Sequence, residues 1–308
     1  MEKQVAEKLV RANSPALDEI LGVPFKVLDQ GHVRAIDYMG DESTIVQAAR
    51  VSYGKGTKKS SEDKNLIKYL LRHKHTTPFE MPTIMLHVRV PMDCWRQWIR
   101  HRTASVNEYS TRYSEAIDDK QETAPNEWRY QSDNNKQGSG SYLTESNGSL
   151  LSAQETMFHK AATDLYRGRL ERGVAREQAR KDLPLSTYTE AYWKMDLHNL
   201  LHFLMLRMDS HAQLEIRKYA TVIGEEIVAQ WVPTVWEAFE DFRGGMNLTN
   251  TEVIILQCIA EGGSIIWKSI GTEQGWLDEN GEATKKNRFR SEMEVKFENI
   301  GIKAPWII

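Results

Sequence analysis

The stretch Arg100-His-Arg-Thr-Ala-Ser-Val-Asn-Glu-Tyr-Ser-Thr-Arg-Tyr113 decides how the rest of the chain is interpreted. It places up to four positive charges within thirteen residues, on Arg100, His101, Arg102 and Arg112. Small polar residues fill the space between them, and almost no side chain here could join a core. Because the planar guanidinium fork of arginine matches a phosphate bidentately, the stretch predicts a site for a phosphorylated or otherwise anionic ligand. The alternative is a solvated surface helix followed by a loop.

Length and composition fit one large domain, alone or with an appendage. The chain has 308 residues, 40% of them hydrophobic, and 40 basic against 43 acidic residues give a formal charge of -3. This balance argues against bulk electrostatic binding to nucleic acid or to an anionic membrane. No apolar run approaches the ~20 residues of a membrane span. The two cysteines, Cys94 and Cys258, and the absence of a signal-like N-terminus favour a reducing, cytoplasmic location without a disulfide framework.

The periodicity of apolar residues places the stretch at the end of a helix. The pattern before it predicts strands at 24–33, 34–38 and 83–90, and helices at 44–50, 64–73 and 92–101. Pro91 stands where the last of these helices begins. The basic stretch therefore starts at a helix C-terminus and continues as a loop.

The residues after the stretch predict a long polar excursion and then alternating helices and strands. We expect 114–149 to form a surface loop or lid, and the capping box Ser152-Ala-Gln-Glu155 to open a helix that ends near Arg172. Further on we expect helices at 176–181, 197–208, 209–231, 252–261 and 290–299, and strands at 187–196 and 265–270. The predicted organisation is an N-terminal arm over 1–24, a main domain over 25–245 and a C-terminal extension over 246–308.

Several histidines have the spacing of metal ligands, but we assign no metal site. His73 and His75 with Glu80 could bind a metal, yet two loop histidines are weak evidence. His198 and His202 have the i,i+4 spacing of a zinc helix, but the next residue after His198 is an asparagine instead of a catalytic glutamate. These two histidines are better explained as hydrogen-bonding edges for a heterocyclic ligand or as core residues.

Two other residues raise the question of catalysis. Cys94 and His101 lie two helical turns apart, about 11 Å, which is too far for direct proton transfer. Arg207 falls in an apolar helix and shares a face with His211 at i,i+4. An arginine in such a place needs an anion beside it. That anion is either a ligand or, in the structural alternative, Asp209 or Glu215.

The motifs together resemble a known family. Arg100-His-Arg102, followed after seven residues by Ser110, is similar to the RHR-x7-S signature of flavin-dependent thymidylate synthases. The resemblance extends from about Phe25 to Phe239 and includes Ala48-Ala-Arg-Val-Ser52, Thr77-Pro-Phe-Glu80, Arg96-Gln-Trp-Ile-Arg100, Leu183-Pro-Leu185 and Leu206-Arg-Met-Asp-Ser-His211.

This resemblance implies an α/β fold (α+β) with a mixed sheet flanked by helices, assembled as a homotetramer that shares its active sites between chains. It implies FAD as cofactor, and the methylation of dUMP to dTMP with 5,10-methylenetetrahydrofolate as carbon donor and NADPH as reductant. Ordinary thymidylate synthases attack C6 of the uracil with a cysteine, whereas this chain has no thiol near its signature. No general base stands beside Ser110 to make it a nucleophile, so we interpret it as a ligand hydrogen bond.

The family's site residues can be carried over position by position. Arg207 matches the residue that polarises the uracil. The positions that match nucleotide contacts are Gln97, Arg100, Glu108, Tyr109, Ser110, Thr111, Arg112, Arg180 and Arg207. The positions that match FAD contacts are Ser52, Thr77, Arg100, His101, Arg102, Glu108, Asp196, Leu197, His198 and His202.

Two other functions remain open from the residues. A nucleic-acid-binding protein could use the arginines and aromatics of 95–113, including Trp95, Trp98 and Tyr109. A pseudo-enzyme could bind the nucleotide and the flavin without turnover.

Overall fold

A computed structural model describes residues 10–51, 60–117, 119–132, 138–262, 265–285 and 287–307. The chain forms two compact units, Met1–Phe242 and Arg243–Ile308, each described here by itself. FAD's expected contact Ser52 lies outside the described residues.

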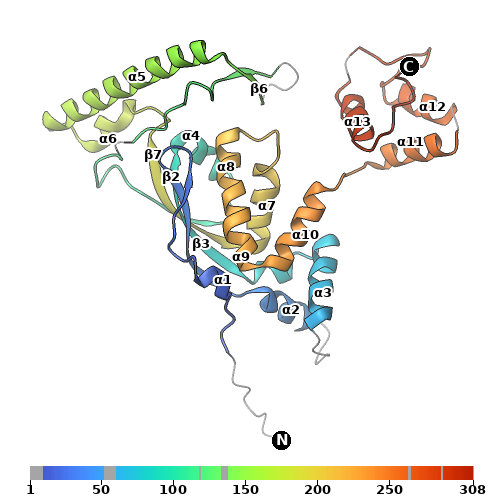
Figure 1. The fold of residues 1–308 in the computed structure, drawn as a ribbon, viewed down its shortest axis with the longest axis horizontal. Coiled ribbons are helices and arrows are strands. Elements are labelled where there is room, and N and C mark those ends of the chain that lie inside the picture. Colours follow the sequence, from blue (N-terminus) through green and yellow to red (C-terminus); the bar gives the residue numbers. More distant parts are fainter. Residues whose placement is uncertain are drawn as a thin grey trace, which may run out of the picture. The chain divides into compact units, whose positions relative to one another are not determined.

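A five-stranded sheet is the centre of the larger unit (Figure 1). Its strands lie in the order β1 (Phe25–Val27), β2 (Gly31–Met39), β3 (Thr83–Pro91), β7 (Tyr188–Asp196) and β4 (Ser105–Glu108). Every pairing between these strands is antiparallel, so the expected mixed sheet was wrong. Alternating apolar residues predict a half-buried strand but carry no information on its direction, which explains the difference.

One face of the sheet is apolar and the other polar, as the alternation predicts. Leu86 of β3 pairs with Trp193 of β7, and both are fully buried, whereas the neighbouring pair His87 and Tyr192 belongs to the other face. Three helices pack on the apolar side: α4 (Met92–Trp98), α7 (Leu197–Arg207) and α8 (Leu214–Val222). The core of the unit therefore lies between the sheet and these helices.

The remaining helices of this unit flank the core. They are α1 (Pro15–Asp18), α2 (Glu42–Val51), α3 (Ser60–Arg72), the short η1 (Thr77–Glu80), α6 (Arg176–Ala179), η2 (Arg180–Asp182), the π-helical turn η3 (Ile223–Val228), α9 (Ala229–Trp231) and α10 (Pro233–Gly244). The helix predicted over 209–231 thus starts five residues later and is interrupted by the π-helical turn.

The excursion over 114–149 is more ordered than we expected. It contains a hairpin of β5 (Arg129–Gln131) and β6 (Ser139–Tyr142), and the long helix α5 (Glu145–Glu171) already begins within it. Two ion pairs tie the segment to α8: Arg129 Nη2 lies 2.5 Å from Glu215 Oε1, and Lys218 Nζ lies 2.9 Å from Glu127 Oε1. The segment is therefore docked on the domain.

The predicted capping box at the start of α5 was wrong. The residue that caps the helix is Thr144, and the two supposed capping residues lie inside it. Their side chains instead bind the excursion: Ser152 Oγ donates to Thr123 O at 2.6 Å, and Glu155 Oε2 accepts from Thr123 N at 2.7 Å. A Ser-x-x-Glu pattern thus marks a tertiary contact here.

The smaller unit is a helical module with its own core. It consists of α11 (Asn250–Ala260), α12 (Ile265–Glu273) and α13 (Arg288–Asn299). The strand expected at 265–270 was wrong, because a short apolar run does not by itself distinguish a strand from a buried helix. Three tryptophans, Trp267, Trp276 and Trp306, pack in this core.

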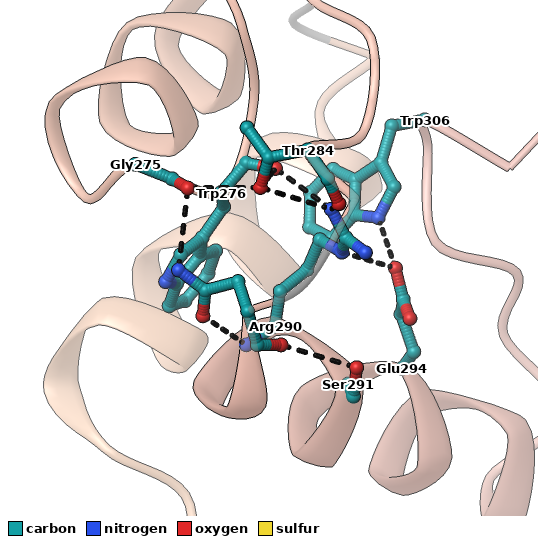
Figure 2. A network of polar contacts seen from close by, with 8 residues as sticks. Gly275, Trp276, Thr284, Arg290, Ser291, Glu294 and Trp306 are labelled. Atoms are coloured by element: carbon teal, nitrogen blue, oxygen red, sulfur yellow. Dashed lines mark hydrogen bonds and ion pairs between the residues drawn. The ribbon is translucent and has the colours of Figure 1, made fainter.

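A buried arginine links the segments of the smaller unit (Figure 2). Arg290 Nη1 donates to the carbonyl oxygens of Trp276 at 3.0 Å and Thr284 at 2.5 Å, and its Nε lies 3.0 Å from Glu294 Oε1. The same carboxylate oxygen accepts from Trp306 Nε1 at 2.6 Å. The arginine thus satisfies two loop carbonyls and one carboxylate at once.

Within the described part of the chain, no helix is both long and apolar enough to cross a membrane.

We expect Arg290→Met to destabilise the smaller unit by about 3 kcal/mol, because it removes the cation beside a partly buried carboxylate. Hydrogen exchange of peptides from α13, measured by mass spectrometry, should then become faster. The matched control is Arg288→Met, whose side chain is 88% exposed in its pair with Glu292. Equal exchange in the two variants would contradict the role of Arg290.

Candidate active site

A pocket of about 340 Å³ lies where the segment after α4 meets α7. Helix α4 ends at Trp98, whose carbonyl oxygen accepts from His101 N at 3.0 Å, and the chain then turns toward β4. The pocket is lined by Arg100, His101, Arg102, Thr103, Trp193, Met195, Asn199, His202, Leu206 and Arg207. The first three are the start of the basic stretch, which therefore meets Arg207 in space although about a hundred residues separate them.

A hydrogen bond between His101 and Arg207 orders the pocket. Arg207 Nε donates to His101 Nε2 at 3.1 Å. Within the described residues, no other hydrogen bond or ion pair reaches this guanidinium, so its two terminal nitrogens remain available to a ligand. Burial and the nearby Arg100 lower the pKa of Arg207 from its usual value. A half-buried guanidinium beside a second one favours an anion between them.

His101 is neutral in this arrangement. Burial, and then the charge of Arg207, lower the pKa of His101 to about 4. Because its Nε2 accepts from the arginine, the proton of the neutral ring is on Nδ1. The ring of Phe203 packs edge-on against the imidazole at 5.0 Å between centroids. His101 therefore accepts the hydrogen bond that orients Arg207, and its Nδ1–H remains for another partner.

The wall of the pocket includes residues that sequence reasoning did not select. Trp193 and Met195 alternate along β7, and both are almost fully buried. Asn199 and Thr103 add polar groups, and Leu206 adds a further apolar one. The sequence predicted a strand at 187–196, but it could not show that the buried face of this strand continues to the end of α4.

A second group of predicted nucleotide contacts lies outside this pocket. The side chain of Arg180 donates to Thr111 Oγ1, and Arg112 Nη2 lies 3.3 Å from Glu177 Oε2 at the surface. Thr189 Oγ1 donates to Glu108 Oε1 at 2.9 Å. The loop also holds Tyr109, whose hydroxyl donates to Glu115 O, and Ser110, whose Oγ accepts from Arg112 N. A single chain thus presents the predicted contacts in two groups.

Two of the other residues matched to FAD contacts, Asp196 and Leu197, have structural roles in the fold. Asp196 caps α7 by accepting from Asn199 N at 2.8 Å, and the side chain of Leu197 is fully buried in the core. His198 follows on the first turn of the same helix. Thr77 lines a different cavity, of about 440 Å³, together with Tyr69 and His75.

The structural alternative for Arg207 is not observed. Glu215 is paired with Arg129, and Asp209 accepts from His211 Nδ1 at 2.8 Å. Helix α7 ends at Arg207, so His211 lies beyond it and the expected shared helical face was wrong.

Neither a thiol nor a metal centre is indicated. Cys94 is fully buried, and burial together with the charge of Asp93 raises its pKa far above the usual value. Such a thiol is a poor nucleophile because only the thiolate attacks. In the described ranges, no group of three or more acidic, histidine or cysteine side chains has metal-binding geometry. The rings of His73 and His75 instead lie near that of Tyr69, at 4.4 and 6.1 Å between centroids.

The aromatic residues needed by a nucleic-acid-binding protein are not accessible. Trp95 and Trp98 are buried at 2% and 0% exposure, so neither can stack on a base. Only Tyr109 of that predicted set is exposed.

Comparison with known proteins gives a consistent result. Residues 34–234 match the family model described as thymidylate synthase complementing protein. A flavin-dependent thymidylate synthase of Wolbachia pipientis wMel is 52% identical over 226 residues, which cover 73% of this chain and 79% of the relative. The protein of the same name from Rickettsia bellii is 48% identical over 277 residues, covering 85% and 94%.

The structural comparison agrees. The UMP/dUMP methylase PolB from Streptomyces cacaoi, solved with 5-Br dUMP, superimposes with a TM-score of 0.64 at 29% sequence identity. The match covers 70% of this chain and 97% of PolB.

The low pKa of His101 predicts a pH dependence of stability. Between about pH 4 and pH 6.5 the unfolded chain binds a proton at His101 that the folded protein does not, so this contribution to stability is present above pH 6.5 and is lost as the pH falls toward 4. We expect His101→Gln, which still offers an acceptor to Arg207, to unfold at a temperature that varies less over this range.

The thermal midpoint of both proteins, measured from pH 4 to pH 7, checks this expectation. His32, His87 and His159 also have lowered pKa values, but their contributions are common to both proteins and cancel in the difference. Parallel curves would show that His101 is not held neutral by the fold.

Proposed function

Because this chain belongs to the family of flavin-dependent thymidylate synthases, we propose that the pocket between the end of α4 and α7 is where it converts dUMP to dTMP. The protein is thus an enzyme, a methyltransferase that requires a flavin. One observation supports this placement of the site. The Nε of Arg207 is bonded to His101, and no described residue binds either of its terminal nitrogens.

The residues of the pocket fit a flavin. Trp193 and Met195 make the base of the pocket apolar, and Asn199, Thr103 and the arginines supply polar groups for the edges of a flat ring system. We assign FAD as the flavin, with Arg100, His101, Arg102 and His202 as contacts in the pocket. The flavin, when bound, supplies the hydride chemistry.

Arg207 is the residue that activates the uracil. The base must become nucleophilic at C5, and negative charge on the ring favours this. A preorganised guanidinium whose two terminal NH2 groups have no partner among the described residues stabilises such charge electrostatically, and it needs no reorganisation because His101 already fixes its orientation. Neutral His101 does not add a competing positive charge.

The phosphate site is assigned to the second group of residues. Arg180 and Arg112, together with Ser110, offer guanidinium forks and a hydroxyl. Since these side chains do not line the pocket of their own chain, we propose that a neighbouring copy contributes them, in a homotetramer with shared active sites. In the same assembly Glu108 would reach both the nucleotide and the flavin.

The remaining participants follow from the reaction. 5,10-Methylenetetrahydrofolate is proposed as the carbon donor and NADPH as the reductant, with tetrahydrofolate and NADP+ as products, in the cytoplasm. A pseudo-enzyme would bind the same molecules without turnover, and an assay separates the two.

The proposal is tested with purified protein loaded with FAD. We expect NADPH to bleach the flavin spectrum, and tritium to be released from dUMP labelled at C5 when the folate is present. Arg207→Ala should lower turnover by at least about a hundredfold, the scale for loss of an electrostatic donor in a transition state. The exposed Arg288→Ala serves as the matched control. Flavin binding without tritium release by the wild type would indicate a pseudo-enzyme.

Cys94→Ala tests whether a thiol takes part. We expect turnover to change by no more than about twofold, because the thiol is buried and protonated, while the free energy of unfolding falls by about 1 kcal/mol from the small cavity. Steady-state kinetics and chemical denaturation measure the two effects. Complete loss of turnover in a folded variant would restore the thiol mechanism.

A further inference from the structure

Three polar side chains of α4 and of the residue before α8 form a connected chain of hydrogen bonds. Asp93 and Gln97 lie four residues apart on α4 and so share a face, and Gln213 is the residue that precedes α8. Gln97 Nε2 donates to Gln213 Oε1, and Gln213 Nε2 donates to Asp93 Oδ2 at 3.4 Å. All three side chains are half-buried.

The carboxylates decide which way round the two amides lie. An ionised carboxylate only accepts, so the amide end of Gln213 that faces Asp93 must be its NH2 group. The carboxylate of Glu215 favours the same orientation of the Gln213 amide. Hydrogen bonds lower the pKa of Glu215, first from Arg129, then from its own backbone and from the Gln213 side chain. Rotating the Gln213 amide by half a turn would bring its carbonyl oxygen toward negatively charged groups.

The orientation of Gln213 then fixes that of Gln97. The oxygen of Gln213 faces Gln97, which must therefore present its own NH2 group. One N–H of Gln97 is used in this bond. Its carbonyl oxygen and its second N–H remain, and within the described residues no protein group binds them.

We propose that Asp93 and Gln213 are positioning residues, which orient the Gln97 amide so that its carbonyl oxygen accepts a hydrogen bond from dUMP. The inference rests on the proposed function, because it takes the nucleotide as the ligand beside Gln97. Gln97 lies one turn before Arg100, whose backbone N–H donates to the main-chain carbonyl oxygen of Gln97 at 3.4 Å, and Arg100 lines the pocket. The nucleotide offers two kinds of donor for this oxygen, the N3–H of the uracil and the hydroxyl of the sugar.

A double-mutant cycle separates positioning from general support of the fold. The dissociation constant of dUMP is measured on the FAD-loaded protein for the wild type, Gln97→Ala, Gln213→Leu and the double variant. We expect each single variant to bind dUMP about tenfold more weakly, the usual effect of one lost hydrogen bond. In the Gln97→Ala background, Gln213→Leu should have no further effect.

Asp93→Asn is the second variant, because it keeps the size of the side chain if Gln213→Leu fails to fold. An asparagine can face Gln213 with either end, so the orientation of both amides is no longer fixed. We expect a loss of a few-fold in dUMP affinity in the Gln97 wild-type background and none in Gln97→Ala. Additive losses in both cycles would overturn the positioning role.

Two analogues identify the donor on the nucleotide. One is dUMP methylated at N3, and the other lacks the sugar hydroxyl. The analogue without the donor that Gln97 reads should bind the wild type and Gln97→Ala equally well. If Gln97→Ala weakens dUMP and both analogues to the same extent, its carbonyl oxygen is not the acceptor and the inference fails. If wild-type protein does not bind dUMP, the proposed function fails and the inference with it.

Discussion

The packing of Trp98 is the constraint on which the site depends. Its fully buried ring contacts those of Trp95, Trp193, Phe203 and Tyr219, with centroids 4.9 to 5.9 Å apart. These rings come from α4, β7, α7 and α8, so one side chain joins the sheet to three helices. Buried aromatic rings contribute large apolar areas and specific geometry. Because Arg100 and His101 follow directly, this packing fixes where the basic stretch leaves the core.

The hydrogen bonds on the polar side of the site orient side chains without neutralising their charges. His101 accepts from Arg207 but carries no opposing charge, and the uncharged Gln213 amide joins the carboxylate of Asp93 to Gln97. Full charges are instead paired a step further away, as in the bond between Glu215 and Arg129 of the excursion. The ligand-facing groups therefore retain their capacity to bind, while the docked hairpin contributes to the order beneath them.

Helices and strands with a strong apolar periodicity could be predicted from the sequence. The prediction failed where one local pattern is compatible with two different structures. β3 and β7 were predicted within one residue because one face of each is buried. Three features depend on tertiary contacts, which a short stretch of sequence does not contain. They are the direction of the strands, the start of α5 and the helix at 265–273. In the site, residue chemistry and resemblance singled out Arg100, His101, Arg102 and Arg207, which the structure brings together in one pocket, while their roles stay predictions. Asn199 and Gln213 were missed because an uncharged amide acquires its role only from its neighbours.

Both cysteines of the chain are buried and reduced, and this has a consequence for handling the enzyme in an oxidising environment. Alkylating reagents and peroxides react with the accessible thiolate, and the raised pKa of Cys94 withholds that form. In the chemistry proposed above, which guanidinium groups and a flavin carry, the enzyme uses no thiolate. It can therefore keep its activity without a thiol reductant, under conditions that inactivate an enzyme built on a nucleophilic cysteine.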